Sequence, residues 1–323
     1  MIKISDAINL INSEIEKISF PAQPGMLYRP AEYVLAAGGK RIRPALVLFT
    51  CNVYSGDYSE AILPSIGIEM FHNFTLVHDD IMDNSPLRRG QPTVHVKWGR
   101  DTAILSGDAM MVLANRFVCG APAPVLKPVM ELFNATALEV CEGQQYDMDF
   151  EQMDTVSEAQ YLEMIRLKTS VLLGAAMKMG AIIGRAPEKD AALLYTFGIN
   201  TGMAFQLRDD LLDVYGSEGF GKQRGGDIIA NKKTLLLIRA LSAADHTIRE
   251  RLMNLLSSSW NDPQEKVAKV LEIYNQLGIE NAVNVMITNY HLKAVDALKK
   301  LTCTSEAKNE LMQFAESLAV RTR

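Results

Sequence analysis

The sequence predicts an all-α protein, a single large helical bundle over residues 1–323, from three observations. Apolar residues recur every three or four positions, the spacing of one helix face, along most of the chain. No run of alternating apolar and polar residues is joined to another by a hairpin turn. No short repeat, low-complexity tract or flexible linker marks a domain boundary, although the length alone also allows two average domains.

The elements of the first third follow from this periodicity and from breaker residues. Isoleucines at helical spacing predict an opening amphipathic helix, which Pro21 and Pro24 end, and Gly38-Gly39 then interrupts the chain. Proline suits the first turn of a helix, so Pro44 predicts a helix start. The expected elements are an opening helix marked by Ile4, Ile8, Ile11, Ile15 and Ile18, helices over Pro44–Tyr54 and Ala61–Met82, a stop at Asn84-Ser85-Pro86, and a polar loop over Leu87–Val96.

From Thr102 onward the helical period continues with few interruptions. The expected helices are Ala103–Val118, Val125–Asp147, Ser157–Met179, Lys189–Val214, Lys232–Ala243, His246–Ser257, Pro263–Leu301 with a break near Gly278, and Ser305–Val320. Ligand sites in helical bundles are built from side chains on facing helices, so polar residues inside these helices are the first candidates for a site.

Two acidic clusters with the same DDxxD pattern are the strongest functional signal. The first acidic cluster is Asp79, Asp80 and Asp83, and the second acidic cluster is Asp209, Asp210 and Asp213. Helix residues at i, i+1 and i+4 fall within an arc of about 100°, so each cluster shares one helix face, where its charges repel. Carboxylates select Mg²⁺ or Ca²⁺, and Mg²⁺ in particular binds a few carboxylates together with substrate phosphates. One cluster alone also fits a solvated helix end, whereas two clusters on apolar helices predict metal ions in a central cavity.

Composition excludes several classes of protein. A formal net charge of −5 argues against a nucleic-acid-binding protein, which carries a basic surface. We find neither a signal-peptide pattern nor an apolar stretch long enough to cross a bilayer, so we expect no transmembrane segment. The four cysteines are scattered without a CxxC pair and fit buried thiols in a reducing compartment, so we expect a cytoplasmic protein.

Basic residues gather near glycines and near the acidic clusters. They are Lys40 and Arg43 after Gly38-Gly39, Arg88 and Arg89 after the first acidic cluster, Lys222 and Arg224 after Gly221, and then Lys232. Arginine binds phosphate bidentately and lysine binds it as a point charge, so these residues suit a diphosphate beside a metal site. We interpret Arg41, Lys178 and Lys233 as ordinary surface charge.

Two polar positions lie inside apolar helices. Lys168-Thr169 interrupts an apolar helix, and a buried lysine needs a partner, for which Asp147 on the preceding helix is the candidate. His72 lies two turns before the aspartates on nearly their face, although a lone histidine is more often a core residue. The chain has no GxSxG, HExxH or Walker-type motif, so we expect electrostatic stabilisation of a leaving diphosphate and no covalent enzyme intermediate.

These motifs, in this order, resemble the trans-isoprenyl diphosphate synthases, also called polyprenyl synthetases. The resemblance runs from Gly38 to Thr234, and the rest of the chain resembles the family only in being helical. It implies an isoprenoid-synthase fold around a central cavity, usually as a homodimer. It also implies Mg²⁺-dependent condensation of isopentenyl diphosphate with an allylic diphosphate. The motifs are Gly38-Gly39-Lys40-Arg41-Ile42-Arg43-Pro44, the two acidic clusters with their flanks, Leu87-Arg88-Arg89-Gly90, Gly107-Asp108, Gly143-Gln144, Lys168-Thr169, Gly221-Lys222 and Lys232-Lys233-Thr234.

The resemblance implies a role for each motif residue. The two acidic clusters would hold three Mg²⁺ on the allylic diphosphate. Residues that would contact this diphosphate are Arg88, Lys168, Lys222 and Lys232, with Gln206 nearby. Residues that would hold isopentenyl diphosphate are Lys40, Arg43, His72 and Arg89. Thr169 and Gln206 would also help to stabilise the allylic cation.

Product length rests on two residues before the first acidic cluster. In the family, the positions five and four residues before the first aspartate help to set the cavity floor, and here they are Phe74 and Thr75. An aromatic residue there, with an uninterrupted DDxxD, resembles synthases that make geranylgeranyl diphosphate; farnesyl or longer polyprenyl diphosphates are the alternatives. An ideal helical wheel, however, puts Phe74 nearly opposite the aspartates.

Two rival functions are weaker. A terpene cyclase also ionises a diphosphate, but its second metal motif is not usually DDxxD, and it lacks the basic residues for a second diphosphate. A non-catalytic subunit of a two-chain synthase tends to lose one acidic motif, and both are intact here.

Overall fold

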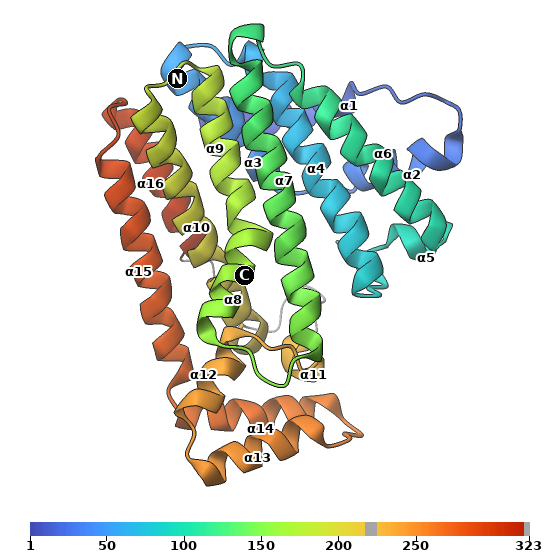
Figure 1. Cartoon of the computed structure of the whole chain (residues 1–323), viewed down its shortest axis with the longest axis vertical. Coiled ribbons are helices and arrows are strands. Elements are labelled where there is room, and N and C mark those ends of the chain that lie inside the picture. The colour runs from blue at the N-terminus through green and yellow to red at the C-terminus, as the bar shows by residue number, and fades with distance from the viewer. Residues whose placement is uncertain (217–224, 320–323) are drawn as a thin grey trace. The chain divides into compact units, whose positions relative to one another are not determined.

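The computed structural model describes residues 1–216 and 225–319, and over these ranges the chain is almost entirely helical (Figure 1). The all-α prediction is therefore confirmed. The elements are α1 Ile4–Glu16, α2 Gly25–Ala36, α3 Ile42–Ser55, the 3₁₀ turn η1 Ser59–Ala61, α4 Ile62–Met82, β1 Leu87–Arg88, β2 Gln91–Pro92, α5 Val94–Trp98, α6 Arg100–Val118, α7 Ala123–Gln152, α8 Glu158–Ile165, the π-helical turn η2 Arg166–Ser170, α9 Val171–Ile183, α10 Glu188–Tyr215, α11 Gly226–Ile229, α12 Leu235–Ala243, α13 His246–Ser257, α14 Pro263–Gln276, α15 Ile279–Lys299 and α16 Ser305–Ala319.

The first third departs from the prediction in two places. Helix α2 occupies a stretch that we assigned to no element. We read its prolines as breakers, but Pro24 is the N-cap of the helix and Pro30 is tolerated inside it. The polar loop expected over Leu87–Val96 is instead the antiparallel hairpin β1–β2 followed by the start of α5. The two turn residues, Arg89 and Gly90, have φ of 53° and 74°, the left-handed conformation that a tight two-residue hairpin turn requires.

The predicted helix Ser157–Met179 is not continuous. A π-helical turn, η2, separates α8 from α9 and contains Lys168 and Thr169. Such turns occur frequently at functional sites. The break predicted near Gly278 is confirmed, because Gly278 has φ of 64° and lies between α14 and α15.

The chain divides into two compact units. Unit 1 comprises Met1–Ala137, Leu172–Tyr195 and Lys300–Glu310. Unit 2 comprises Leu138–Val171, Thr196–Lys299 and the chain from Leu311 onward. Each unit is assembled from separate stretches of sequence, and the organisation as one domain stays a prediction.

In unit 1, α4 is the central helix. It packs against α3 and α6, while α1 covers α3 and α2 lies against α6 (Figure 1). The aromatic rings of Phe49, Phe71 and Phe133 are almost fully buried in its core.

In unit 2, α12 packs against α8 and α15, and α14 packs against α11, α13 and α15 (Figure 1). The C-terminal half of α10 belongs to this core through Leu207 and Leu211, which are buried. None of the helices in the described ranges combines the length and apolar character needed to span a membrane.

Candidate active site

The first acidic cluster closes α4. Asp79 and Asp80 lie in the last turn and Asp83 caps the helix. The C-terminal end of a helix carries partial negative charge, so carboxylates there need a nearby cation. Arg88 on β1 supplies one: its Nε lies 2.8 and 2.9 Å from the two carboxylate oxygens of Asp80, and its Nη2 lies 3.4 Å from Oδ2 of Asp79. Burial nevertheless raises the pKa of Asp80 above its usual value.

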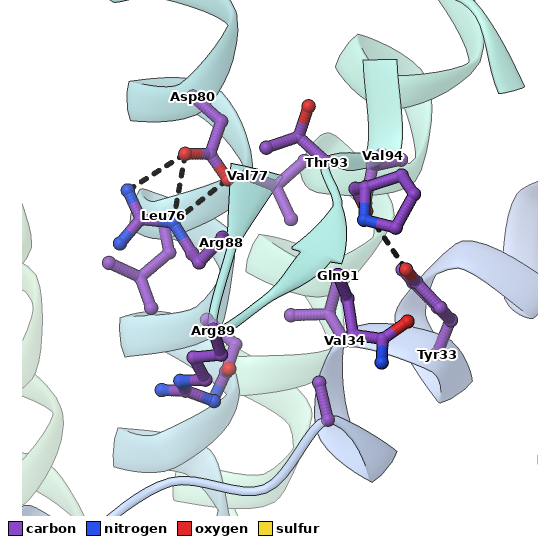
Figure 2. Close-up of a pocket in the computed structure, with 13 residues that line it drawn as sticks. Tyr33, Val34, Leu76, Val77, Asp80, Arg88, Arg89, Gln91, Thr93 and Val94 are labelled. Atoms are coloured by element: carbon purple, nitrogen blue, oxygen red, sulfur yellow. Dashed lines mark hydrogen bonds and ion pairs between the residues drawn. The ribbon is translucent and has the colours of Figure 1, made fainter. Parts of the chain in front are cut away.

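The hairpin β1–β2 directs its two arginines differently. Figure 2 shows the guanidinium group of Arg88 turned toward Asp80 and that of Arg89 turned away from it. Both line a pocket whose remaining walls are largely aliphatic side chains of α2, α4 and the start of α5. The hairpin that the sequence analysis missed is therefore the element that separates two cationic positions in unit 1.

Arg89 lies beside the other predicted ligands of a second anion, which we call the basic set: Lys40, Arg43, His72 and Arg89. Its guanidinium donates to the carbonyl of Gly38 and packs on Gly39, where an added Cβ would lie 2.9 Å from Nη2 of Arg89. Arg43 Nη1 lies 3.2 Å from His72 Nε2. The structure thus brings Arg43, His72 and Arg89 together, while the side chain of Lys40 is exposed.

The electrostatics of the basic set favour an anion. Burial, followed by the charges of Arg43 and Arg89, holds the pKa of His72 well below its usual range. Burial also lowers the pKa of Arg43 and of Arg89. Several guanidinium groups therefore crowd a neutral imidazole, an arrangement that a bound diphosphate would stabilise.

Arg41 is not the surface residue that we predicted. It is 4% exposed and donates from Nη1 to Oε1 of Glu69 at 2.5 Å, with a further bond from Nε to Asn12 at 3.3 Å. Glu69 also accepts from the side-chain amide of Asn73 at 3.1 Å. This buried pair fastens the segment that carries Lys40 and Arg43 to α4.

The second acidic cluster lies near the end of α10 in unit 2. The Asp210 carboxylate is 5% exposed and accepts from the hydroxyl of Tyr161 at 2.5 Å and from the amide of Gln206 at 3.1 Å. Burial raises the pKa of Asp210 to about 7, and repulsion from Asp227 and Asp209 adds to the effect of burial. Asp213 accepts from the backbone N–H of Asp227 at 3.0 Å, so it also holds the start of α11.

The π-helical turn presents Lys168 and Thr169. Lys168 Nζ lies 2.6 Å from Oδ2 of Asp147, the partner that the sequence predicted, but the Lys168 side chain is 25% exposed and so is not a buried lysine. Thr169 donates to the carbonyl oxygen of Gln206 at 3.1 Å. Gly143 lets α7 approach the backbone of this turn closely, since a Cβ there would lie 2.3 Å from the backbone nitrogen of Lys168.

The donor chemistry of both acidic clusters fits Mg²⁺. Each offers carboxylate oxygens on one helix face, and burial raises the pKa values of Asp80 and Asp210, so a bound cation would stabilise their charged forms. Among the described residues, no three His, Cys, Asp or Glu side chains are close enough to hold a metal by themselves. A magnesium ion would thus need oxygens from a ligand as well, which is its usual mode with phosphates.

Phe74 and Thr75 lie one turn before the first acidic cluster. The ring of Phe74 is half-buried, with its centroid 4.7 Å from that of His78 and 5.7 Å from that of Phe71. Thr75 donates to the carbonyl of His72 at 2.8 Å. His78 in turn lies against Gly107 of α6, so Phe74 shares the face of α4 that approaches α6.

Other predictions met mixed outcomes. Lys222 and Arg224 lie outside the described residues, and Lys232 is exposed. Lys233 is not ordinary surface charge, because its ammonium donates to the carbonyls of Phe150 and Glu151 at 2.7 and 3.0 Å. Cys119 and Cys141 are exposed, contrary to the expectation of buried thiols.

Sequence reasoning missed Tyr161 and Asp227. Tyr161 gave no signal, because a tyrosine in a helix is ordinary until its partner is known. Asp227 follows Gly225-Gly226, and this pair of glycines after an acidic helix was the available hint.

Comparisons with known proteins show the family of this chain. The family model described as polyprenyl synthetase matches residues 24–277. The chain is 43% identical over 240 residues to the geranylgeranyl pyrophosphate synthase of Geoglobus acetivorans, covering 73% of this chain and 75% of that protein. It is 36% identical over 256 residues to the geranylfarnesyl diphosphate synthase of Natronomonas pharaonis, with 73% and 75% coverage. The crystal structure of the geranylgeranyl pyrophosphate synthetase from Pyrococcus horikoshii superposes with a TM-score of 0.92 at 36% identity, covering 98% of this chain and 97% of that one.

Proposed function

Because this chain belongs to the polyprenyl synthetase family and is a trans-prenyltransferase, we propose that it condenses isopentenyl diphosphate with an allylic diphosphate to give geranylgeranyl diphosphate. The observation that carries the proposal is the presence, in unit 1, of two separate cationic positions. Arg88 bonds to the carboxylate of Asp80, whereas Arg43 contacts His72 and Arg89 bonds to the carbonyl of Gly38. Two anionic substrates need two such positions.

The allylic diphosphate would bind at the acidic clusters. Arg88, Lys168, Lys222 and Lys232 supply its cationic contacts, and the aspartates of both clusters would hold three Mg²⁺. Bound magnesium would neutralise the charge that develops on the departing diphosphate. Arg88 is already placed to move from Asp80 to a phosphate oxygen.

Isopentenyl diphosphate would bind at the basic set. In the reaction, the allylic C–O bond breaks and its electron pair leaves with the diphosphate. The isopentenyl double bond then forms the new C–C bond, and a proton is lost to the departing diphosphate. Thr169 and Gln206 direct oxygen atoms toward the cation, and the basic set holds the second substrate in place for attack.

The test of the reaction is chromatography of the products formed from isopentenyl diphosphate with dimethylallyl, geranyl or farnesyl diphosphate. We expect a twenty-carbon main product from each primer. A cyclic hydrocarbon would indicate a terpene cyclase instead, and no product from any primer would contradict the proposal.

The product length is proposed to depend on Phe74. Its half-buried ring stands about 7.5 Å along the helix axis from Asp79, one five-carbon unit away. Phe74→Ala should therefore lengthen the main product, and Thr75→Phe should shorten it, because a growing chain that meets a side chain cannot advance. An unchanged product distribution with a lowered melting temperature would make Phe74 a packing residue.

The substrate assignment is tested with Arg89→Ala. We expect the KM for isopentenyl diphosphate to rise about tenfold or more, the usual loss for one hydrogen bond to a charged group. The KM for the allylic primer should change less. Equal changes would show that the two diphosphate positions are assigned wrongly.

We further propose a cytoplasmic homodimer in which α6 forms part of the interface. Leu105 and Val112 are 61% and 69% exposed, one above the other on one face of this helix. Apolar side chains on one helix face favour association. Val112→Glu should lower the mass measured by light scattering to that of a monomer, whereas Val285→Glu, at the exposed Val285 on α15, should not.

A further inference from the structure

A chain of hydrogen bonds in unit 2 runs from the core to a half-exposed threonine. Tyr161 and Asp210 are buried, at 4% and 5% exposed, whereas Gln206 and Thr169 are half-buried. The links are 2.5 Å from the Tyr161 hydroxyl to Oδ2 of Asp210, 3.1 Å from the Gln206 amide to Oδ1 of Asp210, and 3.1 Å from the Thr169 hydroxyl to the carbonyl oxygen of Gln206.

Every donor in this chain points toward Asp210. The NH₂ group of Gln206 donates to Asp210, and its carbonyl oxygen therefore faces Thr169. Thr169 donates its only hydroxyl hydrogen to that oxygen, so the lone pairs of its own oxygen stay available as acceptors. Hydrogen bonds linked in series polarise one another, and negative character from Asp210 therefore reaches the oxygens of Gln206 and Thr169.

The backbone around Thr169 is built to fix this geometry. The π-helical turn η2 sets the direction of the Thr169 side chain. Glycines flank the turn: Gly143 faces Lys168, and a Cβ at Gly202 would lie 2.8 Å from the Cα of Ser170. Close approach on both sides keeps the turn from relaxing to a regular helix.

We propose that Tyr161 is a positioning residue that acts through Asp210 to aim the oxygens of Gln206 and Thr169 at the allylic cation. This inference rests on the proposed function. Tyr161 fixes one carboxylate oxygen, so the other is left to orient the Gln206 amide. Tyr161 exchanges no proton and touches neither substrate. Asp210 thereby stabilises the cation indirectly, through Gln206 and Thr169, in addition to holding Mg²⁺.

Tyr161→Phe removes only the hydroxyl, and Tyr290→Phe, at a partly buried tyrosine of the same unit, is the matched control. The measurement is calorimetric binding of an ammonium analogue of the allylic cation, with inorganic diphosphate and Mg²⁺ present, compared with its uncharged isostere. We expect Tyr161→Phe to lose about tenfold in affinity for the ammonium analogue and to keep its affinity for the isostere. The control should keep both affinities.

Kinetics give a second readout. Tyr161→Phe should lower kcat by about tenfold or more with both KM values near those of the wild type, since the chain acts on the cation and not on the ground state. Thr169→Val should remove most of the effect of Tyr161→Phe, because it breaks the same chain at its other end. Additive effects of the two substitutions would overturn the inference.

If Tyr161→Phe fails to fold, Asp210→Asn replaces it in the calorimetric binding experiment. A selective loss for the ammonium analogue would again support the inference, and an equal loss for the isostere would assign Asp210 to metal binding alone. A wild-type protein that forms no prenyl product would contradict the proposed function. An active wild type with an unaltered Tyr161→Phe variant would contradict only the role of Tyr161.

Discussion

In unit 1, Asp80 lies in the last turn of α4 against the guanidinium of Arg88, whereas in unit 2 the equivalent residue, Asp210, lies inside α10 against the hydroxyl of Tyr161. Both are buried, at 4% and 5% exposed. The charge of Asp80 is thus met by a cation, but the charge of Asp210 is met only by neutral donors. Burial raises the pKa of both carboxyl groups, that of Asp210 to about 7, and the contact with Arg88 opposes the rise at Asp80.

The difference shows that one sequence pattern serves two electrostatic tasks. Under the proposed function Arg88 would leave Asp80 for a phosphate, so the first acidic cluster would exchange a protein cation for a ligand. The second acidic cluster has no cation among its hydrogen-bond partners at Asp210 in the described residues, so it depends more on bound metal.

The largest effect is expected from removing divalent cations. Chelation should lower turnover by at least about a thousandfold, since each acidic cluster would lose a contact worth about 3–4 kcal/mol in the transition state. Adding Mg²⁺ back should restore the rate. Condensation that persists in excess chelator would contradict the assignment of metal ions to both acidic clusters.

The next effect concerns the second arginine–carboxylate pair of unit 1. Glu69→Ala leaves Arg41 buried without its counter-charge and should lower the free energy of unfolding by about 3–5 kcal/mol. The double substitution Arg41→Met/Glu69→Leu should recover most of this loss. If the single and double variants are equally destabilised in denaturant titration, the loss does not come from an unpaired Arg41 charge.

Asp80→Ala and Asp209→Ala compare the clusters in catalysis. Each should lower kcat by about a hundredfold to a thousandfold, because each removes a carboxylate that acts on the leaving diphosphate. Circular dichroism should show the helical content of the wild type in both variants. A spectrum that collapses together with the activity would mark these residues as structural.

The smallest effects should differ in size. In metal-free protein at pH 8, Asp80→Asn should change stability by less than about 1 kcal/mol, because burial raises the pKa of Asp80 while the bonds from Arg88 lower it. Asp210→Asn should raise stability, because it removes a buried, repelled charge.

The pH dependence follows from the pKa of Asp210, which is raised from about 4 in the unfolded chain to about 7 in the fold. Its contribution to stability is complete below pH 4 and is lost as the pH rises to 7, by about 1.4 kcal/mol per pH unit. The advantage of Asp210→Asn over wild type in melting temperature should therefore be larger at pH 8 than at pH 5. An advantage that does not change with pH would show that Asp210 is not the titrating group.

The sequence by itself determined the helices with clear period and breakers. Gly278 ended a helix as predicted, because its φ is positive, and Pro44 lies in the first turn of α3. Local sequence also identified the acidic clusters, since three charges on one helix face depend only on the helical repeat. The pairing of Lys168 with Asp147 is as predicted, although Lys168 is 25% exposed and the burial that motivated the prediction is absent.

Only the tertiary structure decided which neighbours those charges have. Arg41 and Arg88 stand in basic stretches of similar appearance, yet one is buried on Glu69 and the other lies on Asp80. Asp80 and Asp210 occupy the same place in the same motif, yet their partners come from eight and forty-nine residues away. The physical reason is that burial and hydrogen bonding, which set the pKa of a carboxylate, depend on side chains brought together by packing, and helical periodicity carries no information about them.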